Sequence, residues 1–323
     1  MRCLTRVFAA AFLLAMSVSP ALAAYPERPI NFIVPFGAGG SSDLIVRAVS
    51  PILEKYLGQP IVVQNKAGGG GGIGTSAIAH AKPDGYTIGM TQAGPVVIQT
   101  HYGGLDYTID DFEYITVIAA SPIILVANTK VPFKTTAEMI DWAKANPGQL
   151  RLALAAIGGL PHMMVEALAK ANGFTVKTMP QPGNAQVLTT CMGGFSQLAV
   201  AHPSDLQAYI KSGEVVALGV GEAERLPDLP DIPTFKEQGF DIVMNVWKGV
   251  GAPKGTPPEV LEFLRDAFDK ASQDPAWAEA LNRIGEPPHY MNAEDFKATV
   301  ERDDAIYLDL ITALGMYNKN VTK

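Results

Sequence analysis

Short apolar runs alternate with longer amphipathic stretches along most of the chain. The run at 30–34 precedes a stretch, 42–57, in which apolar residues recur at helical spacing. Further runs at 61–63 and 86–90 enclose a short helical stretch at 73–81. Strands that alternate with helices indicate α/β layers with mostly parallel sheets.

The same alternation extends to the end of the chain. It predicts strands at 115–119, 123–127, 150–155, 198–200, 215–220 and 242–250, and helices at 136–146, 162–171, 184–192, 204–211, 257–271, 275–284 and 293–314. Pro51 lies inside the predicted helix 42–57, where its missing N–H predicts a kink or a cost of about 3 kcal/mol.

Four glycine-rich turns follow predicted strands, at 36–42, 67–74, 92–95 and 157–161. In α/β sheets, ligands bind beyond the carboxyl ends of strands, where helices begin. Because the four turns fall in two halves of the chain, they predict a ligand cleft between two lobes.

The first of these turns, Phe36 to Asp43, has the features of an anion site. Its three glycines allow close approach of the main chain, and Ser41 or Ser42 can cap the helix that follows. A helix start directs N–H groups and a positive dipole end at a bound anion. This turn is therefore expected to hold a negatively charged group without a fixed cation.

The first residues have the composition of a secretory signal peptide. Arg2 and Arg6 precede a short apolar core, and a small-x-small cleavage pattern ends at Ala23. We predict that residues 1–23 are removed and that the mature protein is periplasmic. Removal of these two arginines changes the formal net charge from −7 to −9.

Charge and cysteine content argue against nucleic-acid binding and against a disulfide-stabilised fold. An acidic chain without a basic run has little electrostatic reason to bind nucleic acid. Cys191 is the one cysteine that remains after residue 23, so no intramolecular disulfide is expected. It is interpreted as a small buried hydrophobic residue.

Signals for enzymatic chemistry are weak. Ser42 stands at the third glycine position of a dinucleotide fingerprint, and Asn65-Lys66 follows the second strand in place of an acid. No G-x-S-x-G or H-E-x-x-H occurs, although His162 and Glu166 have helical spacing. We predict no enzymatic activity, no cofactor and no metal. An exported hydrolase or dehydrogenase, or a ligand-sensing subunit that uses the same cleft, remains an alternative.

Four stretches together resemble one known family. They are Tyr25-Pro26-x-x-Pro29-Ile30 with Val34-Pro35-Phe36-Gly37-Ala38-Gly39-Gly40-Ser41-Ser42-Asp43; Gly58-Gln59-Pro60-Ile61-Val62-Val63-Gln64-Asn65 with Ala81-Lys82-Pro83-Asp84-Gly85-Tyr86-Thr87; 225–239; and 249–257. The chain thereby resembles the extracytoplasmic solute-binding proteins of tripartite tricarboxylate transporters, the Bug-type receptors.

The resemblance implies a two-lobed periplasmic-binding-protein fold, type II-like, with a ligand cleft between the lobes and two crossover segments. Lobe 1 would comprise 24–120 plus 240–323, and lobe 2 would comprise 121–239. The protein would capture a small mono-, di- or tricarboxylate for membrane transporter subunits, and we expect a monomer.

The resemblance also implies which residues contact the ligand, largely through main-chain amides and ordered waters. The expected contacts are Phe36, Ala38, Gly40, Ser41, Ser42, Ala93, Ile157, Gly158, Gly159, His162, Gln181, Asn184, Ala201 and His202. The chain departs from the family at Gln181-Pro182-Gly183, where relatives often have tyrosine followed by Lys-Gly. It also departs at Ile157 to Leu160, where relatives often place small polar residues.

Overall fold

The computed structural model describes residues 25–154, 157–181 and 184–318, so the predicted signal peptide lies outside the described residues. The strands are β1 (Ile30–Val34), β2 (Ile61–Asn65), β3 (Thr87–Gln92), β4 (Phe112–Ser121), β5 (Ile124–Asn128), β6 (Arg151–Leu154), β7 (Lys177–Pro180), β8 (Leu198–Ala201), β9 (Val215–Val220), β10 (Val246–Pro253) and β11 (Pro288–Met291). The α-helices are α2 (Ser41–Leu57), α3 (Gly72–Ala79), α4 (Thr136–Ala145), α5 (Leu160–Asn172), α6 (Asn184–Met192), α7 (Pro203–Ser212), α8 (Pro258–Gln273), α9 (Pro275–Arg283) and α10 (Ala293–Ala313). Short helical turns are η1 (Gly69–Gly71), η2 (Gly94–Ile98), η3 (Gln99–Tyr102) and η4 (Ile109–Asp111).

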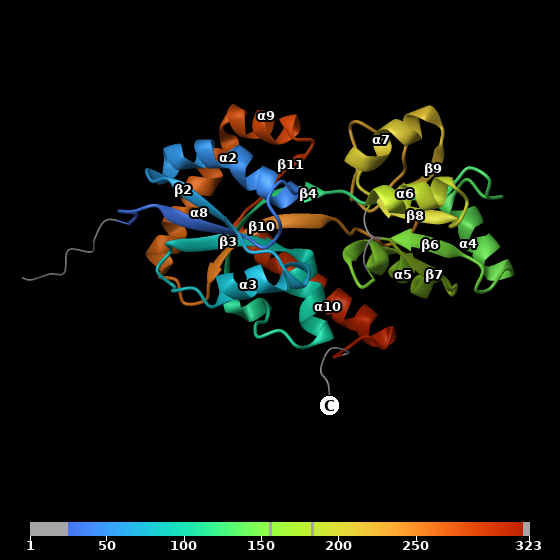
Figure 1. Ribbon diagram of the computed structural model, residues 1–323, viewed down its shortest axis with the longest axis horizontal. Coiled ribbons are helices and arrows are strands. Elements are labelled where there is room, and N and C mark those ends of the chain that lie inside the picture. Colours follow the sequence, from blue (N-terminus) through green and yellow to red (C-terminus); the bar gives the residue numbers. More distant parts are fainter. Residues whose placement is uncertain (1–24, 155–156, 182–183, 319–323) are drawn as a thin grey trace, which may run out of the picture.

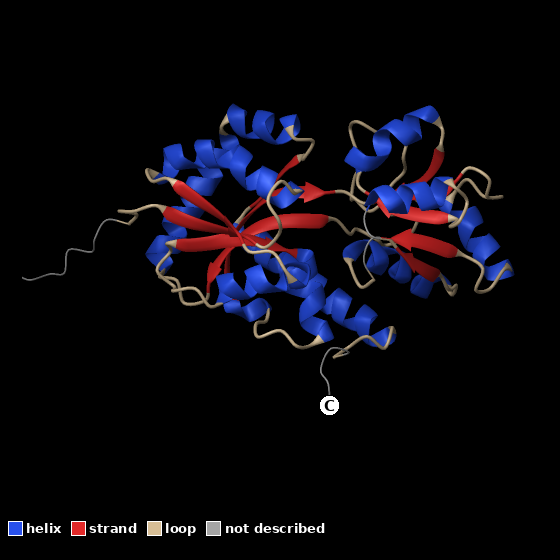
Figure 2. Cartoon of the chain, in the orientation of Figure 1, coloured by secondary structure: helices blue, strands red, loops and turns tan. Residues whose placement is uncertain are grey.

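The strands form two separate sheets, which lie side by side along the long axis of the molecule (Figure 1). The larger lobe contains a six-stranded sheet of order β11-β4-β10-β3-β1-β2. The smaller lobe contains a five-stranded sheet of order β7-β6-β8-β5-β9. Helices pack around both sheets, so each lobe is a layered α/β unit (Figure 2).

The chain passes between the two sheets twice. It leaves the larger sheet after Ser121 and enters the smaller sheet at Ile124, and it returns between Val220 and Val246. Ser121 pairs in register with Val246, so the two crossover segments depart from the same edge of the larger sheet.

Strand direction places the predicted ligand turns at the edges that face the crossovers. In the larger sheet, β1 is parallel to β2 and β3, and both β3 and β4 are antiparallel to β10. Strands β1, β2 and β3 therefore end at the same edge as β4. In the smaller sheet, β6, β7 and β8 are mutually parallel and β8 is antiparallel to β5. Those three strands therefore end at the edge where β5 begins.

Several sequence-based expectations are corrected. The sheets are not mostly parallel, because five strand pairings among the described residues are antiparallel and four are parallel. The last strand predicted from the sequence, at 242–250, corresponds to β10, which lies at Val246–Pro253. Helix α2 runs through Pro51 as one element of 17 residues. Strands β7 and β11 were not predicted, since each has only four residues with little burial.

Burial of large side chains holds the larger lobe together around β10. Trp247 is almost fully buried, and its indole Nε1–H donates a 2.9 Å hydrogen bond to Asp303 on α10. Its ring packs edge-on against Phe296, with ring centroids 5.1 Å apart. Trp247 is thus a core residue of the larger lobe. No described helix combines the length and the apolar composition needed to cross a bilayer.

Candidate ligand-binding site

The turn between β1 and α2 is shaped by the buried carboxylate of Asp43. Its oxygens accept hydrogen bonds from the Gly39 N–H at 2.9 Å, Arg47 Nε at 2.9 Å and Asn65 Nδ2 at 3.0 Å. Burial alone would raise the pKa of this carboxyl, but these donors outweigh it and hold the pKa below its ordinary value. Asp43 is therefore ionised, and its carboxylate holds the turn in place through these hydrogen bonds.

Neither serine caps α2, contrary to the sequence-based expectation. The residue at the N-cap is Gly40, which makes no side-chain capping bond. Ser42 is buried, and its hydroxyl accepts a 2.5 Å hydrogen bond from Gln92 Nε2 at the end of β3. Both serines lie inside the helix, so the first N–H groups of α2 have no side-chain cap.

The hydroxyl of Ser41 belongs to a charged cluster that sequence reasoning missed. Ser41 Oγ accepts a 2.5 Å hydrogen bond from Lys248 Nζ and donates to Glu286. Lys248 also lies 2.6 Å from Glu286 Oε2. The expectation that the turn has no fixed cation is therefore wrong, although a carboxylate already pairs with this cation. A lone lysine in the apolar stretch 246–253 was the available signal, because a buried charge requires a partner.

Close packing explains part of the glycine run at 67–74. A Cβ atom on Gly74 would lie 2.5 Å from Pro35 Cα and 2.6 Å from the Lys66 carbonyl oxygen. Helix α3 thus rests directly on the backbone of the first turn. The half-buried Phe36 packs beside Gly71 and Pro95. Ala38 is exposed in the turn, while Ala93, which follows β3, is fully buried.

In the smaller lobe, the turn before α5 is held by His162. The Gly158 N–H donates a 3.1 Å hydrogen bond to His162 Nδ1, and His162 Nε2 lies 3.3 Å from Glu166 Oε1. The ring is buried, so its role is to shape the turn. Ile157 is exposed, and Gly159 is the N-cap of α5 without a side-chain capping bond.

The remaining expected contacts lie at the same edge of the smaller sheet. Gln181 follows β7, and its side chain is engaged internally, because Oε1 accepts from Thr190 Oγ1 at 3.2 Å. Asn184 begins α6. Ala201 ends β8, and His202 is the N-cap of α7, with Nδ1 2.9 Å from the Pro122 carbonyl in the first crossover.

Helix starts at the two facing edges differ from several helix starts elsewhere. Helices α2, α5 and α7 begin at these edges, and none has a side-chain cap. By contrast, the side chains of Thr135, Asp274 and Asn292 cap α4, α9 and α10. Helix α8, which follows the opposite end of β10, is also uncapped. The facing edges therefore present helix starts whose N-cap side chains make no capping bond, and the positive dipole ends of these helices suit an anion.

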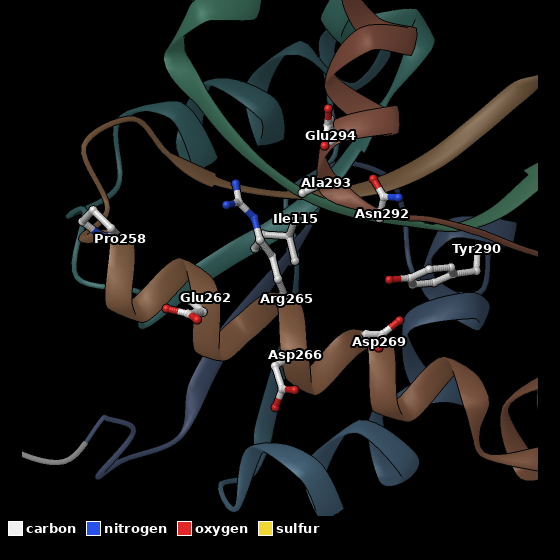
Figure 3. A pocket seen from close by; sticks show the side chains of 10 residues that line it. All are labelled: Ile115, Pro258, Glu262, Arg265, Asp266, Asp269, Tyr290, Asn292, Ala293 and Glu294. Atoms are coloured by element: carbon white, nitrogen blue, oxygen red, sulfur yellow. The ribbon is translucent and has the colours of Figure 1, made fainter.

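Other features of the described residues do not extend this site. A cavity of about 650 Å³ lies against α8 and β11 and is lined by Arg265, three carboxylates of α8 and Tyr290 (Figure 3). The Arg265 guanidinium donates to the Tyr114 carbonyl at 2.9 Å. None of the expected ligand contacts lines this cavity. Burial raises the pKa of the Cys191 thiol to about 12, so this cysteine is not a ready nucleophile.

Comparisons with known proteins agree with this architecture. The family described as "Tripartite tricarboxylate transporter family receptor" matches residues 45–316. The protein BugT of Bordetella pertussis is 33% identical over 268 residues, covering 82% of each chain.

Solved structures give the same result. A solute-binding protein from Polaromonas has 30% identity and a TM-score of 0.82, over 90% of this chain and 99% of that one. A protein of R. palustris, solved with adipate, has 28% identity and a TM-score of 0.73, over 90% and 98% of the two chains. These likenesses confirm the expected two-lobed α/β fold. The chain belongs to the receptor family of tripartite tricarboxylate transporters.

Proposed function

We propose that this receptor captures a small organic carboxylate between the facing edges of its two lobes and delivers it to a tripartite tricarboxylate transporter. The observation that carries the proposal is the set of uncapped helix starts at α2, α5 and α7. Carboxylates at the two ends of a ligand would accept main-chain N–H bonds from opposite lobes. The family relative solved with adipate supports a dicarboxylate as one candidate.

The charges at this site favour binding without catalysis. The lysine nearest to the start of α2 is already paired with Glu286, so N–H groups and helix dipoles would hold the ligand. The buried Cys191 offers no activated thiol. We therefore propose a binding protein that releases its ligand unchanged.

Membership of the family supports a wider proposal. We propose that the protein acts after export to the periplasm as a monomer, with lobes at 24–120 plus 240–323 and at 121–239. Closure of the lobes on the ligand would exclude water and present a defined surface to the transporter. Co-purification of the liganded protein with either a transporter or a membrane sensor distinguishes delivery from sensing.

A thermal-shift screen of C3 to C8 carboxylates, followed by calorimetric titration, tests the binding function. A ligand that binds only the folded state raises the melting temperature. A complete absence of shifts across mono-, di- and tricarboxylates would contradict the proposal. Product analysis after incubation checks that the bound acid is returned unchanged.

A bulky substitution at the start of α2 localises the site. The variant Gly40→Leu should abolish binding and retain the fold, because Gly40 has an extended backbone and a Cβ there would meet only the Gly37 carbonyl, at 3.3 Å. The matched control Ala137→Leu adds the same side chain to the exposed first turn of α4, at the far edge of the smaller sheet. Retained affinity in Gly40→Leu would exclude this turn from the site.

A further inference from the structure

Four side chains from separate segments converge at the start of α2. Lys248 of β10 lies 2.6 Å from Glu286 Oε2 and 2.5 Å from Ser41 Oγ. The Ser121 hydroxyl, at the end of β4, donates a 2.9 Å hydrogen bond to Glu286 Oε2, and Ser41 donates to Oε1. One carboxylate thus receives a cation and two hydroxyl donors.

The ion pair of the cluster is largely shielded from solvent, whereas Ser41 is exposed. The side chain of Lys248 is 5% exposed and that of Glu286 is 14% exposed. Burial lowers the pKa of Lys248, which Glu286 counteracts. For Glu286, the contacts with Lys248, Ser41 and Ser121 outweigh burial and lower its pKa. Lys248 Nζ lies 2.6 Å from the Glu286 carboxylate, so the two opposite charges compensate each other and the ion pair has no net charge.

Stability alone gives a weak reason for such a pair. Desolvation of two buried ions offsets most of their attraction, and apolar replacements of equal volume are often no less stable. The location is more informative. Ser41 is the first residue of α2, while Ser121 and Lys248 lie beside the two crossovers between the lobes. The Glu286 carboxylate thus occupies an anion position at the edge where the ligand is proposed to bind.

We propose that Glu286 is a resident anion that neutralises Lys248 and thereby determines how much negative charge the ligand site accepts. This inference rests on the proposed carboxylate-binding function. With Glu286 in place, the start of α2 offers dipoles and no unpaired cation, so an additional ligand carboxylate gains no ion pair there. Without its charge, Lys248 would attract ligands in proportion to their negative charge.

Affinity for ligands of graded charge tests this role. Calorimetry with acetate, adipate and tricarballylate compares wild type with Glu286→Gln, Lys248→Met and the double variant. In Glu286→Gln, the ratio of the affinity for tricarballylate to the affinity for acetate should be about tenfold higher than in wild type. The reason is that the uncompensated charge of Lys248 acts strongly in a poorly solvated site. Lys248→Met should produce the opposite order, and the double variant should restore the wild-type order.

The control Glu237→Gln makes the same change in net charge at the exposed Arg225–Glu237 pair of the smaller lobe. It should leave the affinity order unchanged. Equal changes for all three acids in Glu286→Gln would show a packing effect and overturn the inference.

A second experiment does not depend on the ligand. Crystals of Glu286→Ala grown in bromide should contain a bromide ion between Lys248 Nζ, Ser41 Oγ and Ser121 Oγ, where wild-type crystals contain the carboxylate. A Glu286→Ala structure with these three side chains in place and no bromide would refute the anion position. If wild type binds none of the acids, the proposed function fails for these acids, while the bromide result still decides this inference.

Discussion

The Tyr102 hydroxyl, in the larger lobe, donates a 2.7 Å hydrogen bond to the Gly158 carbonyl, in the smaller lobe. Tyr102 ends η3, and Gly158 lies in the turn that precedes α5. Burial raises the pKa of Tyr102 to about 12, so the hydroxyl remains a donor at neutral pH. This bond directly links a turn of the proposed site to the opposite lobe. A second link is the 2.7 Å ion pair between Lys170 and Asp309.

The variant Tyr102→Phe removes this interlobe bond and leaves the ring in place. A hydrogen bond of this kind contributes about 0.5–1.5 kcal/mol, so we expect roughly two- to tenfold weaker ligand binding. Titration calorimetry measures the change. Tyr107→Phe is the matched control, because its hydroxyl donates to the Pro95 carbonyl within the larger lobe. Equal losses of affinity in both variants would argue against a specific interlobe role.

The conformation of Gly158 makes it sensitive to any side chain. Its φ is +82°, and a Cβ there would lie 2.8 Å from Tyr102 Cζ. Gly158→Ala should therefore lower the free energy of unfolding by about 2–4 kcal/mol, from the left-handed conformation and the clash together. Gly173→Ala controls for backbone strain alone, because φ is +70° there and a Cβ would have no neighbour within 4 Å. Urea denaturation that shows the same loss in both variants would remove the clash from the explanation.

Protonation of Asp43 should lower the free energy of unfolding as the pH falls. Because its folded-state pKa is below the ordinary 3.8, its stabilisation is present above that value and is lost as the pH falls through the folded pKa. We expect Asp43→Asn to cost about 1–3 kcal/mol at neutral pH and to reduce the loss of stability on acidification. Denaturant unfolding between neutral pH and pH ~3 measures both effects. The exposed Asp141→Asn on α4 is the control, and an unchanged acid response in Asp43→Asn would contradict the assignment.

Local patterns predicted much of this fold because the parallel strands of each sheet come from segments that follow one another along the chain. The order β1, α2, β2, α3 and β3 appears directly as apolar runs separated by helical stretches. The position of β10 could not be read in this way. It inserts between β3 and β4 through the pairing of Lys248 with Gln92 and Ala119, more than 100 residues away along the chain. Such long-range pairing made the sheets more antiparallel than the sequence indicated.

In the candidate site, too, features that depend on neighbouring residues were predicted, and features that depend on distant residues were not. The glycine turn and its helix start were visible in the sequence, since they depend on adjacent residues. The partners of Ser41 were not, because Lys248 and Glu286 reach it from distant segments. A capping role for Ser41 or Ser42 was the natural local expectation, but tertiary hydrogen bonds to these side chains prevailed.

Contact between α3 and the first turn gives a final prediction. A Cβ on Gly74 would meet backbone atoms of Pro35 and Lys66, at 2.5 Å and 2.6 Å, and backbone cannot rotate away as a flexible side chain can. Gly74→Ala should therefore cost about 3 kcal/mol or more, at the upper end of overpacking effects. Gly37→Ala is the control, because a Cβ at Gly37 would have no neighbour within 4 Å. Thermal melts without ligand measure both variants. A Gly74→Ala melting temperature equal to that of Gly37→Ala would mean that α3 can move away from the turn, and that this glycine is not required for close packing.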